Sequence, residues 1–297
     1  MIQNTEQLSS YHSMLDTYNT QDLVNAFVDD QANAVQAVQA AAASLAAAVD
    51  AAVPRIRAGG RLLYFGAGTS GRLAMLDCVE LNPTFSWDKS RAVARLAGGD
   101  DAMNEAAEGA EDDEAAGATE LRALAPTAND VVILVAASGR TPYVVAALQA
   151  ARAAGALTIG IVNNPGSVID ALAEIPVVLD TGAEVISGST RLKAGTAQKI
   201  ALNSLSSAIM VRLHKVYGNL MVDMRATNNK LVRRALRLTV AASGATRTAA
   251  REALEACGYE IKTAIVVLCC RIDPGEARLR LAQAEGSVGS VVQSGKA

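Results

Sequence analysis

The chain has 297 residues, of which 51% are hydrophobic, so it is long enough to bury one sizeable core and a smaller unit beside it. Its formal net charge of -3 and a pI near 5.5 argue against a broad nucleic-acid surface, which normally shows an excess of Lys and Arg. This composition excludes a disordered chain and a general nucleic-acid binder. An anionic ligand would need a locally positive pocket.

The N-terminal part shows neither a secretion signal nor a membrane span. The first residues, MIQNTEQLSSYH, have neither the basic start nor the apolar stretch of a signal peptide. The Ala-rich stretch 40–53 is interrupted by Ser44 and Asp50 and is too short to span a bilayer, so an ordinary packed helix is the better interpretation. We therefore expect a cytoplasmic protein that makes no use of a membrane.

The sequence contains four cysteines and two histidines, and neither type shows the spacing of metal ligands. The cysteines are too few for a disulfide scaffold and are expected to be reduced thiols. We predict no metal site and no cofactor. The residues concerned are Cys78, Cys257, Cys269, Cys270, His12 and His214.

A helical N-terminal section and a parallel sheet are the first elements along the chain. Residues 21–53 are rich in Ala, Gln, Val and Leu and stop before Pro54, which predicts helix. From Arg61 onward, short apolar runs end in Gly, Ser or Thr and lead into helix-like segments, a pattern typical of a parallel α/β sheet. The runs lack in/out alternation, as strands covered on both faces should. The expected strands are 61–65, 92–96, 130–136, 157–162 and 175–179.

Helical patterns dominate the rest of the chain. Two long ones follow the last strand, at 190–217 and 222–236. From Arg237 onward, three short helical segments are separated by Ser243-Gly244, by Gly258 and by Asp273-Pro274-Gly275, and the tail 286–297 shows no pattern. We expect an N-terminal helical section at 1–55 that packs on the core, an α/β domain at 56–236 and a small helical domain at 237–297.

Three loops rich in Gly, Ser and Thr are candidates for holding a phosphate. They read GAGTSGR at 66–72, ASGRTP at 137–142 and SGSTRLK at 187–193. In an open parallel sheet, ligands bind beyond the carboxyl ends of the strands, where glycines, hydroxyls and helix N-termini can surround an anion. The expected binding residues are Gly68, Thr69, Ser70, Ser138, Gly139, Arg140, Thr141, Ser187, Ser189, Thr190 and Lys193.

Each loop taken alone has a simpler interpretation, in which Gly and Ser make the turn and cap the helix. Gly66, Gly68 and Gly71 also match the dinucleotide pattern G-x-G-x-x-G. However, no ribose-binding acid is obvious at the expected distance, and no Gly-Lys-Ser/Thr completes a P-loop. A sugar monophosphate, held by hydroxyls and N–H groups without Mg²⁺, fits the three loops better.

Two segments offer carboxylates. Glu80 is expected in the last turn of a helix that ends before Pro83, where a negative charge opposes the helix dipole. Glu108 and Glu111 are three residues apart and can share a helix face, although Gly109 weakens that helix. The acidic run around them also has the plain interpretation of a solvated face. One glutamate from each segment could act as acid and base on a sugar, but spacing does not choose which.

Six motifs, in this order, resemble those of the bacterial N-acetylmuramic acid 6-phosphate etherases. They are GAGTSGR at 66–72, EGAED at 108–112, AASGRTPY at 136–143, GSTRLKAGTAQK at 188–199, YGNLMVD at 217–223 and ATN at 226–228. The resemblance covers residues 59–231 and extends more loosely to KTAIV at 262–266. It implies the sugar isomerase (SIS) fold, an α/β three-layer fold with a central parallel sheet, in a homodimer that uses no cofactor.

The resemblance also implies an activity. It indicates cleavage of the D-lactyl ether of N-acetylmuramic acid 6-phosphate to N-acetylglucosamine 6-phosphate and D-lactate, in peptidoglycan amino-sugar recycling. By motif, Glu80 stands where the family has its proton donor, and Glu111 is the second catalytic carboxylate. Two alternatives share the fold: a sugar-phosphate isomerase, which needs no acid for an ether, and a non-catalytic sugar-phosphate regulator, which needs only the loops.

Overall fold

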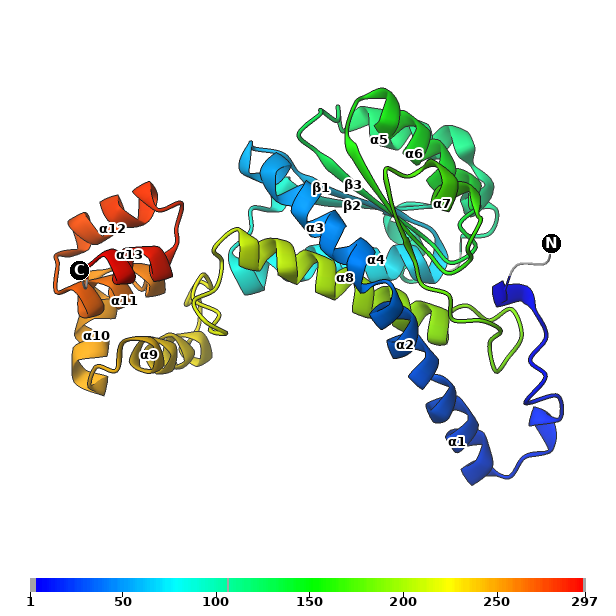
Figure 1. The fold of residues 1–297 in the computed structure, drawn as a ribbon, viewed down its shortest axis with the longest axis horizontal. Helices are drawn as coiled ribbons and strands as arrows, with labels where there is room; N and C mark the ends of the chain where they lie inside the picture. Colours follow the sequence, from blue (N-terminus) through cyan, green and yellow to red (C-terminus); the bar gives the residue numbers. More distant parts are fainter. Residues whose placement is uncertain (1–3, 106, 296–297) are drawn as a thin grey trace. The chain divides into compact units, whose positions relative to one another are not determined.

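Five parallel strands form one sheet in the order β2-β1-β3-β4-β5 in the computed structural model, which describes residues 4–105 and 107–295 (Figure 1). Every residue of β1, β3 and β4 is buried, as the apolar runs require. Each strand begins and ends within one residue of its predicted bounds, so the predicted sheet is confirmed. The strands are β1 Leu62–Gly66, β2 Ala92–Leu96, β3 Val131–Ala136, β4 Leu157–Val162 and β5 Ile175–Val178.

Helices cover both faces of this sheet and give the three layers expected (Figure 1). Neighbouring residues of β1 point to opposite layers: the ring of Phe65 lies 6.2 Å from that of Tyr143 in α6, whereas the Tyr64 hydroxyl donates to Asp77 in α4. One layer holds α5 Glu114–Ala123, α6 Pro142–Ala153 and α7 Val168–Leu172, and the other holds α3 Ala42–Arg57, α4 Gly68–Phe85 and α8 Lys193–Arg212.

The N-terminal section is helical as predicted, but it does not end at Pro54. It comprises short 3-10 turns at Asn4–Glu6 and Leu15–Thr17, followed by α1 Thr20–Asp30, α2 Ala32–Ala40 and α3. Helix α3 continues through Pro54 to Arg57. The proline removes one helical N–H and its ring crowds the carbonyl of Asp50, but the buried side chains of Val53 and Ile56 hold this turn against the core.

Among the described residues, no single helix is both long and apolar enough to cross a membrane. The bent combination of residues 20–40 with α3, at 52° to each other, would pass on length and composition alone.

The chain divides into two compact units. Residues 4–79 and 89–206 form an α/β unit, and residues 80–88 and 207–295 form a helical unit. The domain ranges expected from the sequence, 1–55, 56–236 and 237–297, stay a prediction. The helical unit contains α9 Asn229–Ser243, α10 Arg247–Ala256, α11 Ile261–Cys270, α12 Pro274–Gln283 and α13 Val288–Ser294.

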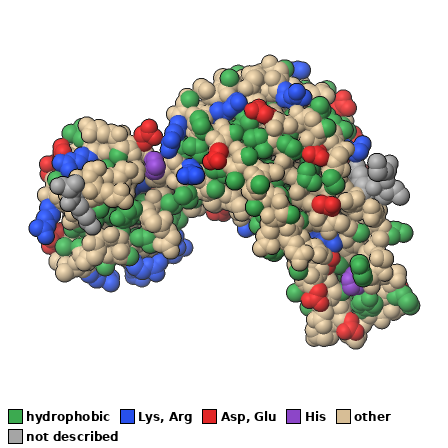
Figure 2. All heavy atoms as spheres, viewed as in Figure 1, with side chains coloured by type: hydrophobic (Ala, Val, Ile, Leu, Met, Phe, Trp, Pro, Cys, Tyr) green, Lys and Arg blue, Asp and Glu red, His purple; other side chains and the backbone are tan. Residues whose placement is uncertain are grey.

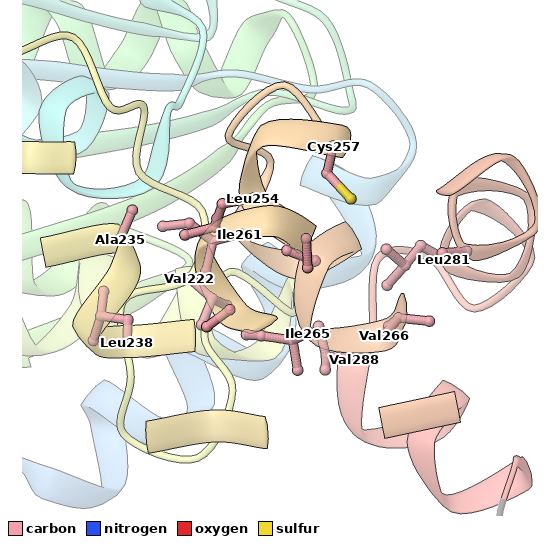
Figure 3. Close-up of a cluster of buried hydrophobic side chains, with 14 of the residues drawn as sticks. Val222, Ala235, Leu238, Leu254, Cys257, Ile261, Ile265, Val266, Leu281 and Val288 are labelled. Carbon is pink, nitrogen blue, oxygen red and sulfur yellow. The ribbon is translucent and has the colours of Figure 1, made fainter. Parts of the chain in front are cut away.

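A cluster of buried apolar side chains holds the helical unit together (Figure 3). Each of its five named helices contributes to the cluster: Leu238 of α9, Leu254 of α10, Ile265 of α11, Leu281 of α12 and Val288 of α13. Helices of this length are marginal in isolation, so their stability comes from this mutual burial.

The long helix predicted at 222–236 is wrong in its bounds. Helix α9 begins at Asn229, because the Asn228 side chain accepts the N–H of Leu231 at 3.0 Å, and it ends at Ser243 before Gly244, whose φ is 70°. The earlier long helix, predicted at 190–217, is confirmed with shorter bounds as α8.

The short C-terminal helices are confirmed, and the predicted breaks at Gly244 and Gly258 separate them. The third predicted separator is only partly right, because Asp273 caps α12 but Pro274 and Gly275 already belong to its first turn. The prediction of an unpatterned tail is wrong. The Ser287 side chain caps α13 by accepting from the Ser290 N–H, and Val291 is buried in the cluster.

A buried carboxylate ties the sheet to two helices. Asp77 of α4 is 3% exposed and accepts from the Tyr64 hydroxyl of β1 at 3.0 Å, and from the Asn203 amide and Ser206 hydroxyl of α8 at 2.6 and 3.0 Å. Burial raises the pKa of Asp77, and the three donors together with the charge of Lys199 offset part of that rise.

Replacing Asp77 by Ala should therefore destabilise the fold. The buried Tyr64 and Ser206 hydroxyls and the half-buried Asn203 amide would lose their acceptor, which we expect to lower the free energy of unfolding by about 3 kcal/mol, measured by urea denaturation. Asp77→Asn keeps one acceptor oxygen and should lose less. The exposed Thr119→Ala in α5 is the control and should stay within about 0.5 kcal/mol of the parent. Equal losses for Asp77→Ala and Thr119→Ala would contradict the role of Asp77.

Candidate active site

A pocket of about 410 Å³ opens at the carboxyl ends of β1 and β3. With the order β2-β1-β3-β4-β5, the chain leaves β1 toward one edge of the sheet and β3 toward the other, and the crevice between them is where parallel sheets bind ligands. The residues that line it are Glu6, Ala67, Gly68, Thr69, Ser70, Glu111, Asp112, Ala136, Ala137, Ser138, Arg140, Thr141, Pro142 and Thr190.

The first loop enters α4 without a spacer. A Cβ on Gly71 would lie 2.6 Å from the carbonyl oxygen of Gly66, so only glycines allow the helix to start this close to β1. Helix α4 begins at Gly68, and Thr69 and Ser70 thus place their hydroxyls and backbone N–H groups in its first turn, at the pocket. The positive end of the α4 dipole faces the site, which suits an anion.

The second loop adds two hydroxyls and a cation. The Ser138 hydroxyl accepts the N–H of Arg140 at 3.1 Å and lies 3.4 Å from the Thr141 hydroxyl. The Arg140 guanidinium is exposed, and among the described residues it has no carboxylate partner. Gly139 has a φ of 64°, and a Cβ there would lie 2.1 Å from the Ser167 hydroxyl, so the loop conformation requires glycine.

Only Thr190 of the third loop lines the pocket. The Ser187 hydroxyl accepts the N–H of Ser9 at 3.2 Å, and Ser189 is not among the lining residues. The Lys193 ammonium, nearly buried, pairs with Asp30 of α1 at 2.7 Å. The structure thus places this cation in an ion pair within the protein and not at the pocket.

The N-terminus of α8, which follows the third loop, is also occupied from within. The backbone N–H groups of Lys193 and Ala194 donate to the two carboxylate oxygens of Glu184 at 3.1 and 2.9 Å. Burial raises the pKa of Glu184, and these two bonds and the charge of Lys193 offset part of the rise. Of these two helix N-termini, only that of α4 is therefore free to bind an external anion.

The two segments that supply candidate carboxylates behave differently. Glu111 and Asp112 line the pocket from the 3-10 turn Ala110–Asp112, which follows Gly109 in the left-handed conformation. The helix face that Glu108 and Glu111 were predicted to share does not form, because the chain turns at Gly109, and Glu108 is exposed outside the pocket.

Glu80 lies on α4, ten residues after Ser70, and is exposed. It is not in the last turn as predicted, because α4 continues through Pro83 to Phe85. It belongs to the segment 80–88 of the helical unit and is not a lining residue of the pocket.

Glu6 also lines the pocket, although no pattern in the sequence pointed to it. The buried Thr5 beside it exchanges hydrogen bonds with Asn164: its N–H donates to the amide oxygen at 3.2 Å, and its hydroxyl accepts from the amide nitrogen at 2.9 Å. Asn164 also donates to the carbonyl of Ala137 in the second loop at 2.9 Å. Residues 159 positions apart are thus joined, and no local sequence pattern predicts such a contact.

The pocket therefore has two chemically different kinds of lining group. Hydroxyls, the first turn of α4 and Arg140 can hold a phosphate, and the carboxylates Glu6, Glu111 and Asp112 can exchange protons with the rest of a ligand. Within residues 4–105 and 107–295, no group of three His, Cys, Asp or Glu side chains is placed to hold a metal ion. The predicted site residues brought together here are Gly68, Thr69, Ser70, Glu111, Ser138, Arg140, Thr141 and Thr190.

The chain is similar to known proteins over nearly its whole length. Residues 44–152 match the glucokinase regulatory protein N-terminal SIS domain, and residues 112–208 match the SIS domain. The chain is 57% identical to the N-acetylmuramic acid 6-phosphate etherase of Deinococcus radiodurans, over 99% of this chain and 96% of that protein. The chain belongs to the N-acetylmuramic acid 6-phosphate etherase family. Etherases of Rubrobacter xylanophilus and Escherichia coli are 48% and 43% identical, over 98% and 97% of this chain and 96% and 97% of theirs.

Solved structures extend the likeness at the level of the fold. The phosphoheptose isomerases of Francisella tularensis and Neisseria gonorrhoeae each give a TM-score of 0.51, at 19% and 18% identity. Each likeness covers 65% of this etherase-family chain, with 98% and 100% of the respective isomerase. The predicted SIS fold is confirmed.

The second loop offers a direct test of its geometry. Gly139→Ala adds both the strain of a positive φ and a clash with Ser167, so it should lower the free energy of unfolding by about 2 kcal/mol or more. Gly166→Ala is the matched control, because Gly166 has a φ of 68° and nothing within 4 Å of its ideal Cβ. We expect the control to lose at least about 1 kcal/mol less in urea denaturation. Equal losses in the free energy of unfolding for the two variants would show that the close approach of Gly139 to Ser167 adds nothing to the destabilisation.

Proposed function

We propose that this chain cleaves the D-lactyl ether of N-acetylmuramic acid 6-phosphate to N-acetylglucosamine 6-phosphate and D-lactate. The observation that carries the proposal is a near full-length identity of 57% to an etherase, together with a pocket that is lined both by Glu111 and by hydroxyl-rich loops. The role of this reaction would be the recycling of peptidoglycan amino sugars.

In the proposed complex, the 6-phosphate binds at the first turn of α4 and the second loop. Backbone N–H groups and the hydroxyls of Thr69, Ser70, Ser138 and Thr141 donate to its oxygens, and Arg140 supplies a positive charge. Fixing the phosphate positions the sugar for reaction, and it leaves the carboxylates that line the pocket to the opened ring.

The chemistry requires an acid and a base. A base removes the proton at C2 of the open-chain aldehyde, and the C3–oxygen bond breaks as an acid protonates the departing lactate oxygen. Water then adds its hydroxyl to C3 and a proton to C2 of the unsaturated aldehyde. We assign the base to Glu111, which lines the pocket, and the acid to Glu80, by resemblance to the family motif.

We further propose that the enzyme works as a cytoplasmic homodimer. The resemblance to the etherase family over residues 59–231 supports the dimer. Sedimentation or light scattering of the full chain measures its mass directly.

Purified protein incubated with N-acetylmuramic acid 6-phosphate should release D-lactate, which D-lactate dehydrogenase detects through NADH. Glu111→Gln and Glu80→Gln should each lower kcat by about 10²- to 10⁴-fold, the range of general acid–base catalysis. Glu108→Gln, three residues from Glu111 but outside the pocket, is the control and should keep its activity.

Each alternative function has a distinct outcome in the same assay. Interconversion of sugar phosphates without lactate would identify an isomerase instead. Sugar-phosphate binding without turnover, undisturbed by the Glu80 and Glu111 substitutions, would identify a regulator. A loss at Glu108 equal to that at Glu111 would remove the special role of Glu111.

Phosphate binding by the second loop is tested separately. Ser138→Ala removes one donor to a charged group, so KM should rise about 10- to 100-fold with kcat nearly unchanged. Ser189→Ala, predicted from the sequence to act alike, removes a hydroxyl that does not line the pocket and provides the comparison. A fall in kcat at constant KM for Ser138→Ala would contradict its assignment to ground-state phosphate binding.

A further inference from the structure

The helical unit carries a long stretch of one charge sign. Between Ala226 and Arg251 the sequence has six Lys and Arg residues and no Asp or Glu, whereas the whole chain has a formal net charge of -3. Four of the six, at positions 230, 233, 234 and 237, are spaced three or four residues apart in α9 and share one helix face. In Figure 2, Lys and Arg side chains gather at the part of the helical unit where Figure 1 places α9.

These cations stand in an unfavourable arrangement. Like charges three and four residues apart on a helix repel one another. Lys230 lies in the first turn of α9, where the positive end of the helix dipole opposes a cation. Within the described part of the chain, none of the α9 cations pairs with a carboxylate, and Arg247 at the start of α10 has no such partner either.

The same cations surround a cavity of about 620 Å³ within the helical unit. This volume is in the range of small-molecule sites, roughly 300–1,000 Å³. Leu236 and Val240 add apolar wall to the cavity, and Asn229 adds an amide. The cations that line it are Lys230, Arg233, Arg234, Arg237 and Arg247. None of these residues belongs to the pocket at β1 and β3.

We propose that this cavity is a second anion site, which binds a small molecule carrying a diphosphate or triphosphate group. A phosphate monoester has at most two negative charges and would leave most of the five cations unmatched, whereas a diphosphate or triphosphate brings roughly three or four. Arg guanidinium groups suit this ligand, because their planar forks donate two hydrogen bonds to a phosphate. The apolar wall would contact whatever the phosphates are attached to.

Calorimetry of the full chain at low salt, without Mg²⁺, tests the proposal with three probes: orthophosphate, pyrophosphate and ADP. We expect pyrophosphate or ADP to bind at least tenfold more tightly than orthophosphate, with an affinity that falls as salt rises. If ADP binds more tightly than pyrophosphate, the apolar wall contacts the nucleoside. If pyrophosphate binds more tightly, the site is one for the inorganic ion. Both outcomes support the proposal.

Variants place the binding in this cavity. Arg233→Gln combined with Arg237→Gln, both at exposed positions, should weaken pyrophosphate binding at least tenfold, and Arg247→Gln in α10 should weaken it independently. The matched control is Arg251→Gln, which removes a charge from the same basic stretch but lies outside the cavity, and it should stay within twofold. Release of D-lactate should be unchanged in all of these variants.

Four results would overturn the proposal. Equal affinity for orthophosphate and pyrophosphate would show that the site does not select ligands with several phosphates. Unchanged pyrophosphate affinity in both Arg variants would show that binding occurs elsewhere. Tighter binding of a DNA duplex than of ADP would make this face a nucleic-acid surface. A change of oligomeric mass in the double variant, with pyrophosphate binding intact, would make it an interface between copies of the chain.

Discussion

Strands β1 and β3 lie side by side in parallel, yet the chain leaves them in opposite directions. Right-handed connections then put α4 on one face of the sheet and α6 on the other, so neither the β1–α4 nor the β3–α6 connection crosses above the two strand ends. The loops that carry Thr69 and Ser138 both open into helix N-termini at that place. A crevice that favours anions follows from the strand order, and the side chains then decide which anion it accepts.

Contacts made by the first residues of the chain complete this crevice. The bonds between Thr5 and Asn164 fix the N-terminal segment beside the second loop, and they bring Glu6 to the pocket. Two other contacts remove possible anion ligands from the crevice. The Lys193 ammonium is paired with Asp30, and the N-terminal N–H groups of α8 are bound by Glu184. The positive character of the pocket thus depends on Arg140 and the first turn of α4.

The uneven distribution of charged residues explains how a chain with a net negative charge can bind anions. Its acidic residues gather in places such as the run 105–114, while cations concentrate in the stretch from Ala226 to Arg251. In water at physiological salt, charges further apart than about 8 Å are largely screened, so the net charge of the protein matters less at a site than its immediate neighbours. Each site is therefore governed by its own few residues.

The sequence by itself determined the family, the five strands and most helix separators. Strands such as 157–162 are readable because continuous apolar runs between Gly, Ser or Thr reflect burial on both faces. Predictions failed where one local contact overrides a pattern: the cap at Asn228 moved the start of α9, and burial of Val291 turned the tail into a helix. Only the tertiary structure decided the strand order, the arrival of Glu6 at the pocket and the pairing of Lys193 with Asp30. The contacts of Thr5 with Asn164 and of Lys193 with Asp30 join residues more than 100 positions apart, and no local periodicity encodes them.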